Sequence, residues 1–421
     1  MLHTIDPKLH GPLGEPMAKA IETCVHCGFC LPTCPTYEIS GQEMDTPRGR
    51  IVLMKEILEG QLDLTDATTY LDRCLGCLAC ETACPSGVAY RELIGPFRAQ
   101  TANQRQPPLA QRLRRWLIDN TLPYPGRLRL AMQTGRLGKW LHPLVPSFLQ
   151  PMLRLLPEQL PSRQSWPERV PAVGKRRARV ALLIGCAQQI LAPDINTDSI
   201  EVLSRNGVEV IVPPAQGCCG ALAWHEGDLP SARRFAEQNL AAFPTDVDAV
   251  VSNAAGCGST LQEYHLILQG TQLAEEADRF RLRVCDIGAF LEQLGDLQPI
   301  PEPRHPLTIA YHDACHLAHA QNVRHQPRAL LQRIPGVRLV EVPGVQSCCG
   351  SAGTYNIDQP RIAAELGANL AGNLIATEAD RIATGNIGCL MQIRMHLAEQ
   401  GATIPVHHTI SLLAQAYRQQ L

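Results

Sequence analysis

The stretch Cys24-Val25-His26-Cys27-Gly28-Phe29-Cys30-Leu31-Pro32-Thr33-Cys34-Pro35 decides the fold of the N-terminal part, and its cysteine spacing occurs twice. The second copy also ends in a Cys-Pro pair, and its cysteines are Cys74, Cys77, Cys80 and Cys84. Three thiolates two residues apart can wrap one face of an iron–sulfur cube, whereas the cysteine before the proline is held too far away to complete it. In proteins with two such runs, the fourth cysteine binds the other cluster.

The two runs therefore predict two [4Fe–4S] clusters that exchange one ligand. The first is expected to be held by Cys24, Cys27, Cys30 and Cys84. The second is expected to be held by Cys74, Cys77, Cys80 and Cys34. A disulfide framework or zinc knuckles would be the alternative, but a zinc site needs only four ligands and gains nothing from the further cysteines. The chain is predicted to carry electrons.

Length and composition indicate a modular protein that does not bind nucleic acid. A chain of 421 residues exceeds one ordinary domain. Charged residues make up 19% and the formal net charge is −2, which does not favour a strongly charged partner. No apolar run reaches the ~18 residues of a membrane span, and the N-terminus lacks the apolar segment of a signal peptide. We expect the protein in the cytoplasm, including the inner face of the cell membrane. A reducing compartment would keep the cysteines as thiolates that can bind metal.

Four regions are expected, in an α+β multidomain chain. Residues 1–100 form a helical module, because apolar residues recur at helical spacing in Thr46–Leu58, between the cysteine runs. Residues 101–175 form a linker with a few helices and short apolar stretches such as 141–152. Within it, Arg112–Ile118 reads as a basic amphipathic helix that either touches anionic lipid or, as we favour, packs on a neighbour. Residues 176–300 and 301–421 form two related domains.

These two domains are predicted from an internal repeat. Each unit has three short apolar strands that lead into cysteines, and helical stretches such as 194–206 and 363–376 lie between strands. The strands are expected at 178–184, 207–212, 249–251, 307–311, 337–342 and 382–383. The spacing from Cys186 to Cys218 is 32 and from Cys315 to Cys348 is 33, while 219 to 257 is 38 and 349 to 389 is 40. Alternating strands and helices predict a parallel sheet, whose carboxyl edge is where ligands bind.

Each unit supplies four thiols to that edge. They are Cys186, Cys218, Cys219 and Cys257 in the first unit, and Cys315, Cys348, Cys349 and Cys389 in the second. Four thiolates suit an iron–sulfur cluster or a zinc ion, and a bare thiol site is a third alternative. We favour a cluster in at least one unit. Gly220 and Gly350 follow the paired cysteines and supply the freedom for a sharp turn.

Other potential ligands are weaker candidates. Cys285 is expected to be a buried structural thiol, with His407 at the equivalent position of the second unit. Three histidines surround Cys315 and would tune or ligate a cluster, although a histidine near a strand end more often only forms hydrogen bonds. They are His312, His316 and His319.

The long helical connection between the cysteine runs resembles the α-helical ferredoxin domain of fumarate and heterodisulfide reductases. The two repeats resemble the cysteine-rich CCG domains of the heterodisulfide reductase catalytic subunit, which hold non-cubane [4Fe–4S] clusters. The family's fullest pattern ends in Cys-x2-Cys, but here Ala254 and Asn386 stand three residues before Cys257 and Cys389, and Thr260 and Gln392 three residues after. Each unit therefore lacks one ligand of that pattern.

The order of the whole chain resembles the iron–sulfur subunits of bacterial glycolate oxidases. Two blocks strengthen the match, the Leu-x2-Cys-Leu-x-Cys pattern at Cys74 and the residues Tyr311–His316. The C subunit of anaerobic glycerol-3-phosphate dehydrogenase shares this architecture. The resemblance implies an oxidoreductase subunit for the conversion of glycolate to glyoxylate, working with FAD-binding partner subunits and a quinone or another respiratory acceptor.

A partner flavin is needed because oxidation of a 2-hydroxy acid removes two electrons, whereas iron–sulfur clusters accept one at a time. The chain contains no G-x-G-x-x-G after a strand and no P-loop. Two other functions compete. One is a heterodisulfide-reductase-like enzyme that cleaves a disulfide at the Cys-Cys-Gly sites, and the other is a zinc-stabilised scaffold for complex assembly. The first is disfavoured by the missing cysteine in each unit.

Overall fold

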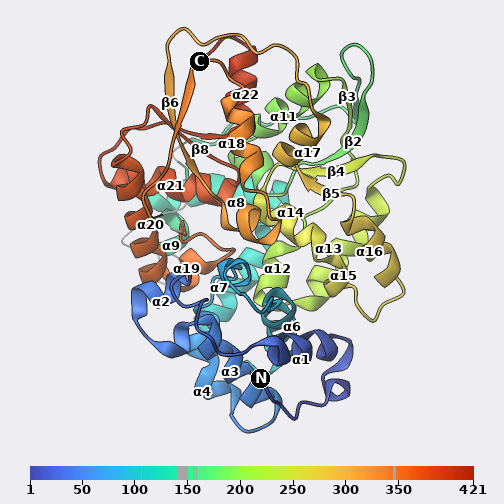
Figure 1. Cartoon of the computed structure of the whole chain (residues 1–421), viewed down its shortest axis with the longest axis vertical. Coiled ribbons are helices and arrows are strands. Elements are labelled where there is room, and N and C mark those ends of the chain that lie inside the picture. Colours follow the sequence, from blue (N-terminus) through green and yellow to red (C-terminus); the bar gives the residue numbers. More distant parts are fainter. Residues whose placement is uncertain (106, 141–149, 155, 158, 345–347) are drawn as a thin grey trace.

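The computed structural model describes residues 1–105, 107–140, 150–154, 156–157, 159–344 and 348–421. The N-terminal helices lie at one end of the molecule, and the two sheet-containing units lie side by side at the other (Figure 1). The first unit carries the green and yellow colours of the chain and the second the orange and red. This arrangement confirms the predicted fold class of a helical module followed by two repeated α/β units.

The N-terminal module contains helices and no strand within residues 1–105, all of which the structure describes. Its elements are η1 (Pro7–Leu13), α1 (Gly14–Thr23), α2 (Pro35–Ser40), η2 (Glu43–Asp45), α3 (Pro47–Leu58), α4 (Leu64–Asp72), α5 (Ala79–Thr82), α6 (Arg91–Thr101) and η3 (Ala102–Gln104). The helix expected between the cysteine runs is α3. It begins there because the Thr46 hydroxyl accepts the Gly49 N–H at 2.9 Å and Pro47 occupies the first turn.

Three helices follow, α7 (Leu109–Thr121), α8 (Pro125–Trp140) and α9 (Gln150–Arg154). Helix α7 packs on its neighbours, as we favoured, because Arg114 pairs with Asp358 and Arg115 pairs with Glu226 at 2.9 Å. Most of the apolar stretch 141–152 lies outside the described residues. Across the part of the chain that the structure describes, no helix is both long and apolar enough to cross a bilayer.

The first unit contains a five-stranded sheet in the order β1-β3-β2-β4-β5. Strand β1 is antiparallel to β3, and the other pairs are parallel. Its elements are β1 (Arg169–Val170), β2 (Ala178–Leu183), α10 (Gln188–Leu191), α11 (Asp194–Arg205), β3 (Val208–Ile211), α12 (Ala221–Glu226), α13 (Leu229–Ala242), β4 (Ala249–Ser252), α14 (Ala255–Gln262), α15 (Tyr264–Ile267), α16 (Ala274–Arg281), β5 (Val284–Asp286) and α17 (Ile287–Leu294).

The second unit contains a parallel sheet in the order β7-β6-β8-β9, which repeats β3-β2-β4-β5 of the first. Its elements are β6 (Leu307–His312), the π-helix η6 (His316–Ala320), α18 (His325–Gln332), β7 (Val337–Val340), α19 (Tyr355–Asp358), α20 (Pro360–Ile375), β8 (Arg381–Thr384), α21 (Ile387–Glu399), β9 (Val406–His408) and α22 (Thr409–Tyr417). All six expected strands are present. Cys285 pairs with Val251 and His407 with Ala383, so the two residues occupy equivalent positions, as predicted.

The sheets are buried on both faces, as parallel sheets require. In β2, Val180 and Leu182 belong to one apolar core, and Ala181 and Leu183 to another. The first of these cores also contains strand β6 and helix α22, so the two units share it. At its rim, Arg418 of the second unit pairs with Asp198 of α11 at 2.9 Å. The units are thus packed as one body.

A buried polar contact lies where the N-terminal module meets the first unit. The Trp224 indole N–H donates to the Glu263 carboxylate at 2.6 Å, and both side chains are buried. The indole also lies over Gly95 of α6, where an added Cβ would approach it to 2.7 Å. Burial raises the pKa of Glu263 from 4.5 to about 7, although Arg91 opposes the shift. This carboxyl therefore titrates near neutrality.

Glu263→Gln is expected to remove part of the pH dependence of stability. The unfolded chain releases this proton above about pH 4.5, whereas the folded protein holds it to about pH 7, so stability falls as the pH rises through this window. Relative to wild type, the variant should gain at most about 3 kcal/mol between pH 5 and pH 8. Denaturant unfolding at several pH values measures this. Glu275→Gln, at a side chain that is 93% exposed, is the control, and parallel curves for both variants would contradict the prediction.

Candidate metal centres

The two cysteine runs adopt the same backbone path. Cys24 follows α1 and Cys74 follows α4, and in each loop the residues two and four positions later have positive φ. They are His26 (58°) and Gly28 (85°) in the first run, and Gly76 (65°) and Leu78 (61°) in the second. Left-handed conformation is unfavourable for residues with a side chain. The left-handed conformation of His26 and Leu78 indicates that each loop curves tightly, so that several thiols point toward one centre.

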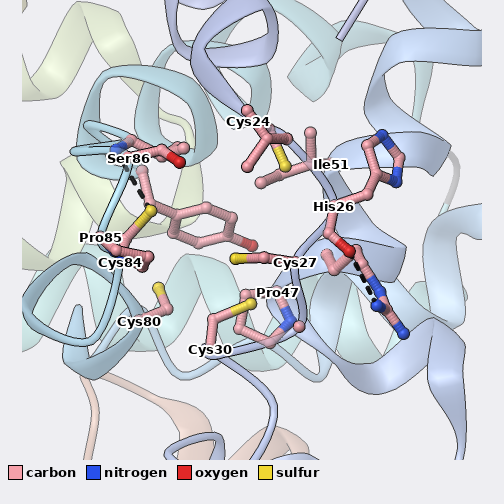
Figure 2. Close-up of a pocket in the computed structure, with 15 residues that line it drawn as sticks. Cys24, His26, Cys27, Cys30, Pro47, Ile51, Cys80, Cys84, Pro85 and Ser86 are labelled. Carbon is pink, nitrogen blue, oxygen red and sulfur yellow. Dashed lines mark hydrogen bonds between the residues drawn. The ribbon is translucent and has the colours of Figure 1, made fainter.

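The first cavity is lined by the cysteines of the first run together with Cys84 of the second (Figure 2). Its empty volume is about 420 Å³, part of which is open to solvent. The sulfur atoms of Cys24, Cys27, Cys30, Cys80 and Cys84 point toward this space. Cys27 is exposed, so the cavity reaches the protein surface. The structure thus brings the predicted first ligand set together and places Cys80 beside it.

The second cavity lies deeper and has an empty volume of about 320 Å³. Its cysteines are Cys34, Cys74, Cys77 and Cys80, the predicted second set. The Gly76 N–H donates to the Cys74 sulfur at 3.4 Å, and the Tyr90 hydroxyl lies 3.7 Å from the same sulfur. Cys80 and Tyr90 line both cavities, so the two candidate centres are adjacent.

A buried arginine joins the two runs. Arg50 of α3 is 1% exposed, and its Nε donates to the Tyr70 carbonyl at 2.8 Å. One Nη lies 3.8 Å from the Cys34 sulfur, and the other pairs with Asp45 at 3.3 Å. Asp45 also pairs with Arg73 at 3.1 Å. Two cations therefore face one buried carboxylate, which leaves a net positive charge beside the second cavity.

The thiol pKa values differ within and between the cavities, because burial raises the pKa of Cys77 and of Cys80 in the second cavity well above the ordinary value. Burial raises the pKa of Cys30 in the first cavity to about 11. Burial also acts to raise the pKa of Cys74 in the second, but the charges of Arg50 and Arg98 outweigh it and lower that pKa. Metal binding needs the thiolate and releases the proton. The surroundings of Cys74 therefore favour the ligating form.

The four thiols of the first CCG unit lie at the carboxyl ends of its strands. The Cys186 and Cys218 sulfurs are 3.5 Å apart, and Cys257 is near enough to Cys219 to raise its pKa. Gly220 has a φ of 84° and donates its N–H to the Cys218 sulfur at 3.4 Å. Three of these cysteines are buried and Cys257 is half-buried.

The thiols of the second CCG unit line a cavity that also contains a cysteine of the N-terminal module. Cys315, Cys348, Cys349 and Cys389 surround about 380 Å³ of empty space, and Cys77 lies in the same lining. The Cys349 and Cys389 sulfurs are 3.1 Å apart, and the Gly350 N–H donates to Cys348 at 3.4 Å. This unit's site therefore directly adjoins the second N-terminal cavity.

The three histidines near Cys315 all make hydrogen bonds. His312 contacts the Thr384 hydroxyl at 3.0 Å, and His316 contacts the Gly76 carbonyl at 3.0 Å. His319 contacts the Thr82 hydroxyl at 2.9 Å. Burial, helped by Arg324, lowers the pKa of His319 to about 4, so this imidazole is neutral at physiological pH. Their metal ligation stays a prediction. Cys285 is half-buried, and burial raises its pKa to about 12.

The donor chemistry fits iron–sulfur clusters. Every candidate centre is lined by thiols, the preferred ligands of such clusters. Among the described residues, no group of three or more His, Cys, Asp or Glu side chains is arranged to hold a single metal ion. A cluster uses its cysteines on different irons, whereas zinc draws four ligands around one point.

Comparisons with known proteins agree with this arrangement. The model of the 4Fe-4S dicluster domain matches residues 20–88, and the model of the CCG cysteine-rich domain matches residues 180–262 and 309–394. The chain is 36% identical over 406 residues to the glycolate oxidase iron-sulfur subunit of Escherichia coli K12, covering 95% of both chains. It is 35% identical over 413 residues to a probable glycolate oxidase iron-sulfur subunit of Bacillus subtilis 168, covering 93% of both.

The chain belongs to the family of glycolate oxidase iron–sulfur subunits. The resemblance inferred from the cysteine runs and the repeats is thereby confirmed. A crystal structure of a hypothetical protein from Helicobacter pylori is similar in fold, with a TM-score of 0.54 and 10% identity, over 98% of this chain and 77% of that one. As a member of the family, the chain carries an iron–sulfur dicluster domain and two CCG domains.

Sequence reasoning missed the charged residues around the thiols of this iron–sulfur subunit. Arg50 lies in Thr46-Pro47-Arg48-Gly49-Arg50-Ile51, a motif that indicated a helix but not a buried cation. Arg98 donates to the Cys74 carbonyl at 2.7 Å and to the His225 carbonyl at 3.1 Å, so it links the second run to the first CCG unit. Arg50 directly precedes the apolar run Ile51–Met54 of the same helix, and this is the signal that was available for its burial.

Proposed function

We propose that this chain is the electron-transfer subunit of a flavin-dependent glycolate oxidase. FAD-binding partner subunits oxidise glycolate to glyoxylate, and this subunit passes the electrons to a quinone or another respiratory acceptor. The observation that carries the proposal is the series of adjacent thiol-lined cavities, in a chain whose relatives are named as glycolate oxidase iron–sulfur subunits. The clusters, when bound, accept and release single electrons.

Each N-terminal cavity is assigned four cysteine ligands. Cys24, Cys27, Cys30 and Cys84 hold the first [4Fe–4S] cluster. Cys74, Cys77, Cys80 and Cys34 hold the second. The lining of the two cavities supports both sets. The CCG thiols hold one or two further clusters. The proposed structural regions of the chain are residues 1–100, 101–175, 176–300 and 301–421.

The protein residues order these centres in space. Cys27 lies at the surface, Cys80 and Tyr90 line both N-terminal cavities, and Cys77 lines the cavity of the second CCG unit. An electron can therefore enter at the surface and move inward through short steps to the second unit. The thiols of the first unit do not line any of these three cavities.

The first test is metal content. The anaerobically purified complex with its partner subunits should contain about 12–16 irons per copy of this chain, with matching acid-labile sulfide, at four irons per cluster. Iron, zinc and sulfide analysis with electron paramagnetic resonance (EPR) measures this. About eight irons with bound zinc would instead support a scaffold role for the CCG domains, and fewer than eight would overturn the proposed N-terminal ligand sets.

Serine variants distinguish the two CCG units. Cys348→Ser should alter the EPR signal of the second N-terminal cluster, because Cys77 lines the same cavity. Cys218→Ser, the equivalent change in the first unit, should leave that signal unaltered. Size-exclusion chromatography confirms that both variants still assemble with the partner subunits. Equal effects of the two variants on the signal would argue against the proposed order.

We further propose that the subunit works at the inner face of the cell membrane. One face of α7 packs on the CCG units through Arg114 and Arg115, and its other face would contact the lipid. The outward residues of α7 are 79% exposed at Leu109, 49% at Leu113 and 59% at Trp116, and they repeat at helical spacing. Arg112 is exposed beside them. An apolar stripe with tryptophan and a cation is typical of helices that lie in the membrane interface.

Flotation with vesicles that contain anionic phosphatidylglycerol tests this contact. The wild-type complex should bind the vesicles, and Trp116→Glu should reduce the bound fraction several-fold because it places a charge in the apolar stripe. Leu282→Glu is the control, since Leu282 is 71% exposed on the first unit. If wild type fails to bind, or both variants lose binding equally, α7 does not face the membrane.

A further inference from the structure

Arg50 is a charged side chain buried between the cysteine runs. It is 1% exposed, and its guanidinium contacts the Cys34 sulfur at 3.8 Å. Its partner Asp45 is fully buried and is shared with Arg73. Arginine keeps its charge under all physiological conditions. The second cavity therefore has a permanent positive charge within contact distance of one of its proposed ligands.

The first cavity has no equivalent buried cation among the residues that line it. Its nearest arginine, Arg48, is 28% exposed and pairs with Glu43 at 2.8 Å. The Arg48 guanidinium donates to the His26 carbonyl at 3.1 Å. Solvent screens such a charge, whereas a charge in the interior is screened far less. The two cavities thus differ in their electrostatic surroundings.

Both cavities also have hydrogen bonds to their sulfurs. In the second, the Gly76 N–H and the Tyr90 hydroxyl contact the Cys74 sulfur. In the first, the Val88 N–H donates to the Cys84 sulfur at 3.5 Å. Positive charge and hydrogen bonds to cluster sulfurs raise the reduction potential, because reduction adds negative charge. Burial acts in the opposite direction by disfavouring that added charge. A buried cation that contacts a ligand of the cluster offsets this effect of burial, because it stabilises the negative charge that reduction adds.

We propose that Arg50 raises the reduction potential of the second cluster above that of the first. Arg50 is not a ligand of the cluster. It acts on the cluster's reduction potential through its contact with Cys34 and through the electrostatic field of its charge in the cavity. Electrons that arrive at the exposed Cys27 side would then move inward, toward Cys77 and the second CCG unit. The inference rests on the proposed ligand sets.

The test is a redox titration of the partner-bound complex, followed by EPR. Arg50→Gln removes the charge but keeps a donor for the Tyr70 carbonyl, and the potential of the second cluster should fall. Arg50→Lys restores a positive charge and should return the potential toward the wild-type value. A signal that Cys27→Ser perturbs is assigned to the first cluster. An unchanged potential in Arg50→Gln, with both clusters loaded, would overturn the inference.

Two further variants keep the test decisive. Asp45→Asn removes the negative partner, so the potential of the second cluster should rise, opposite to Arg50→Gln. Arg48→Gln, a change in the neighbouring arginine of the same motif, should leave the second cluster's potential unaltered. If Arg50→Gln does not load its second cluster, the Asp45→Asn titration decides. The absence of an upward shift of the potential in Asp45→Asn would then contradict the role of Arg50.

Failure of the proposed function gives a different result. If iron analysis of the wild-type complex finds fewer than two clusters in the N-terminal module, the ligand sets are wrong. If both clusters are present and neither Arg50→Gln nor Asp45→Asn shifts the potential of the second cluster, the ligand sets stand. Only the role of Arg50 is then rejected.

Discussion

The buried guanidinium of Arg50 is the interaction on which the N-terminal module depends. It reaches the Tyr70 carbonyl at the end of α4, the Cys34 sulfur at the start of α2 and the Asp45 carboxylate. These groups flank both cysteine runs, so one side chain fixes the distance between them. A buried charge is stable only when it is paired and hydrogen-bonded. All three guanidinium nitrogens have such partners, which makes this position rigid.

The same cysteine loops are braced by the two CCG units. Arg98 ties the Cys74 carbonyl to the first unit, and His316 of the second unit contacts the Gly76 carbonyl. Tyr355 donates its hydroxyl to the Arg73 carbonyl at 2.9 Å. Backbone groups of an irregular loop need partners when they are buried. Because the CCG units supply these partners, they hold the loop of the second cysteine run in a fixed position. The loop therefore keeps its place relative to the cavity of the second CCG unit.

The two CCG units share a topology but not a position. Their sheets have the same strand order, and the Gly220 and Gly350 turns bond the preceding cysteines at the same distance. The second unit places its thiols in one cavity with Cys77, and no thiol of the first unit lines that cavity. Duplication copies the fold and the ligand spacing, whereas packing against a third module breaks the equivalence. Similar sites in the two halves can therefore serve the electron path unequally.

The sequence by itself determined the local patterns of this protein, because cysteine spacing, helical periodicity and strand alternation are properties of nearby residues. It predicted α3, the six strands, the repeat and the four-cysteine groups, but not Cys80 in the lining of the first cavity. The short strand β1, the burial of Arg50 and the contact of Cys77 with the second unit came only from the tertiary structure. Each depends on residues far apart in the chain. Charge and burial at such sites are set by packing, which no local pattern records.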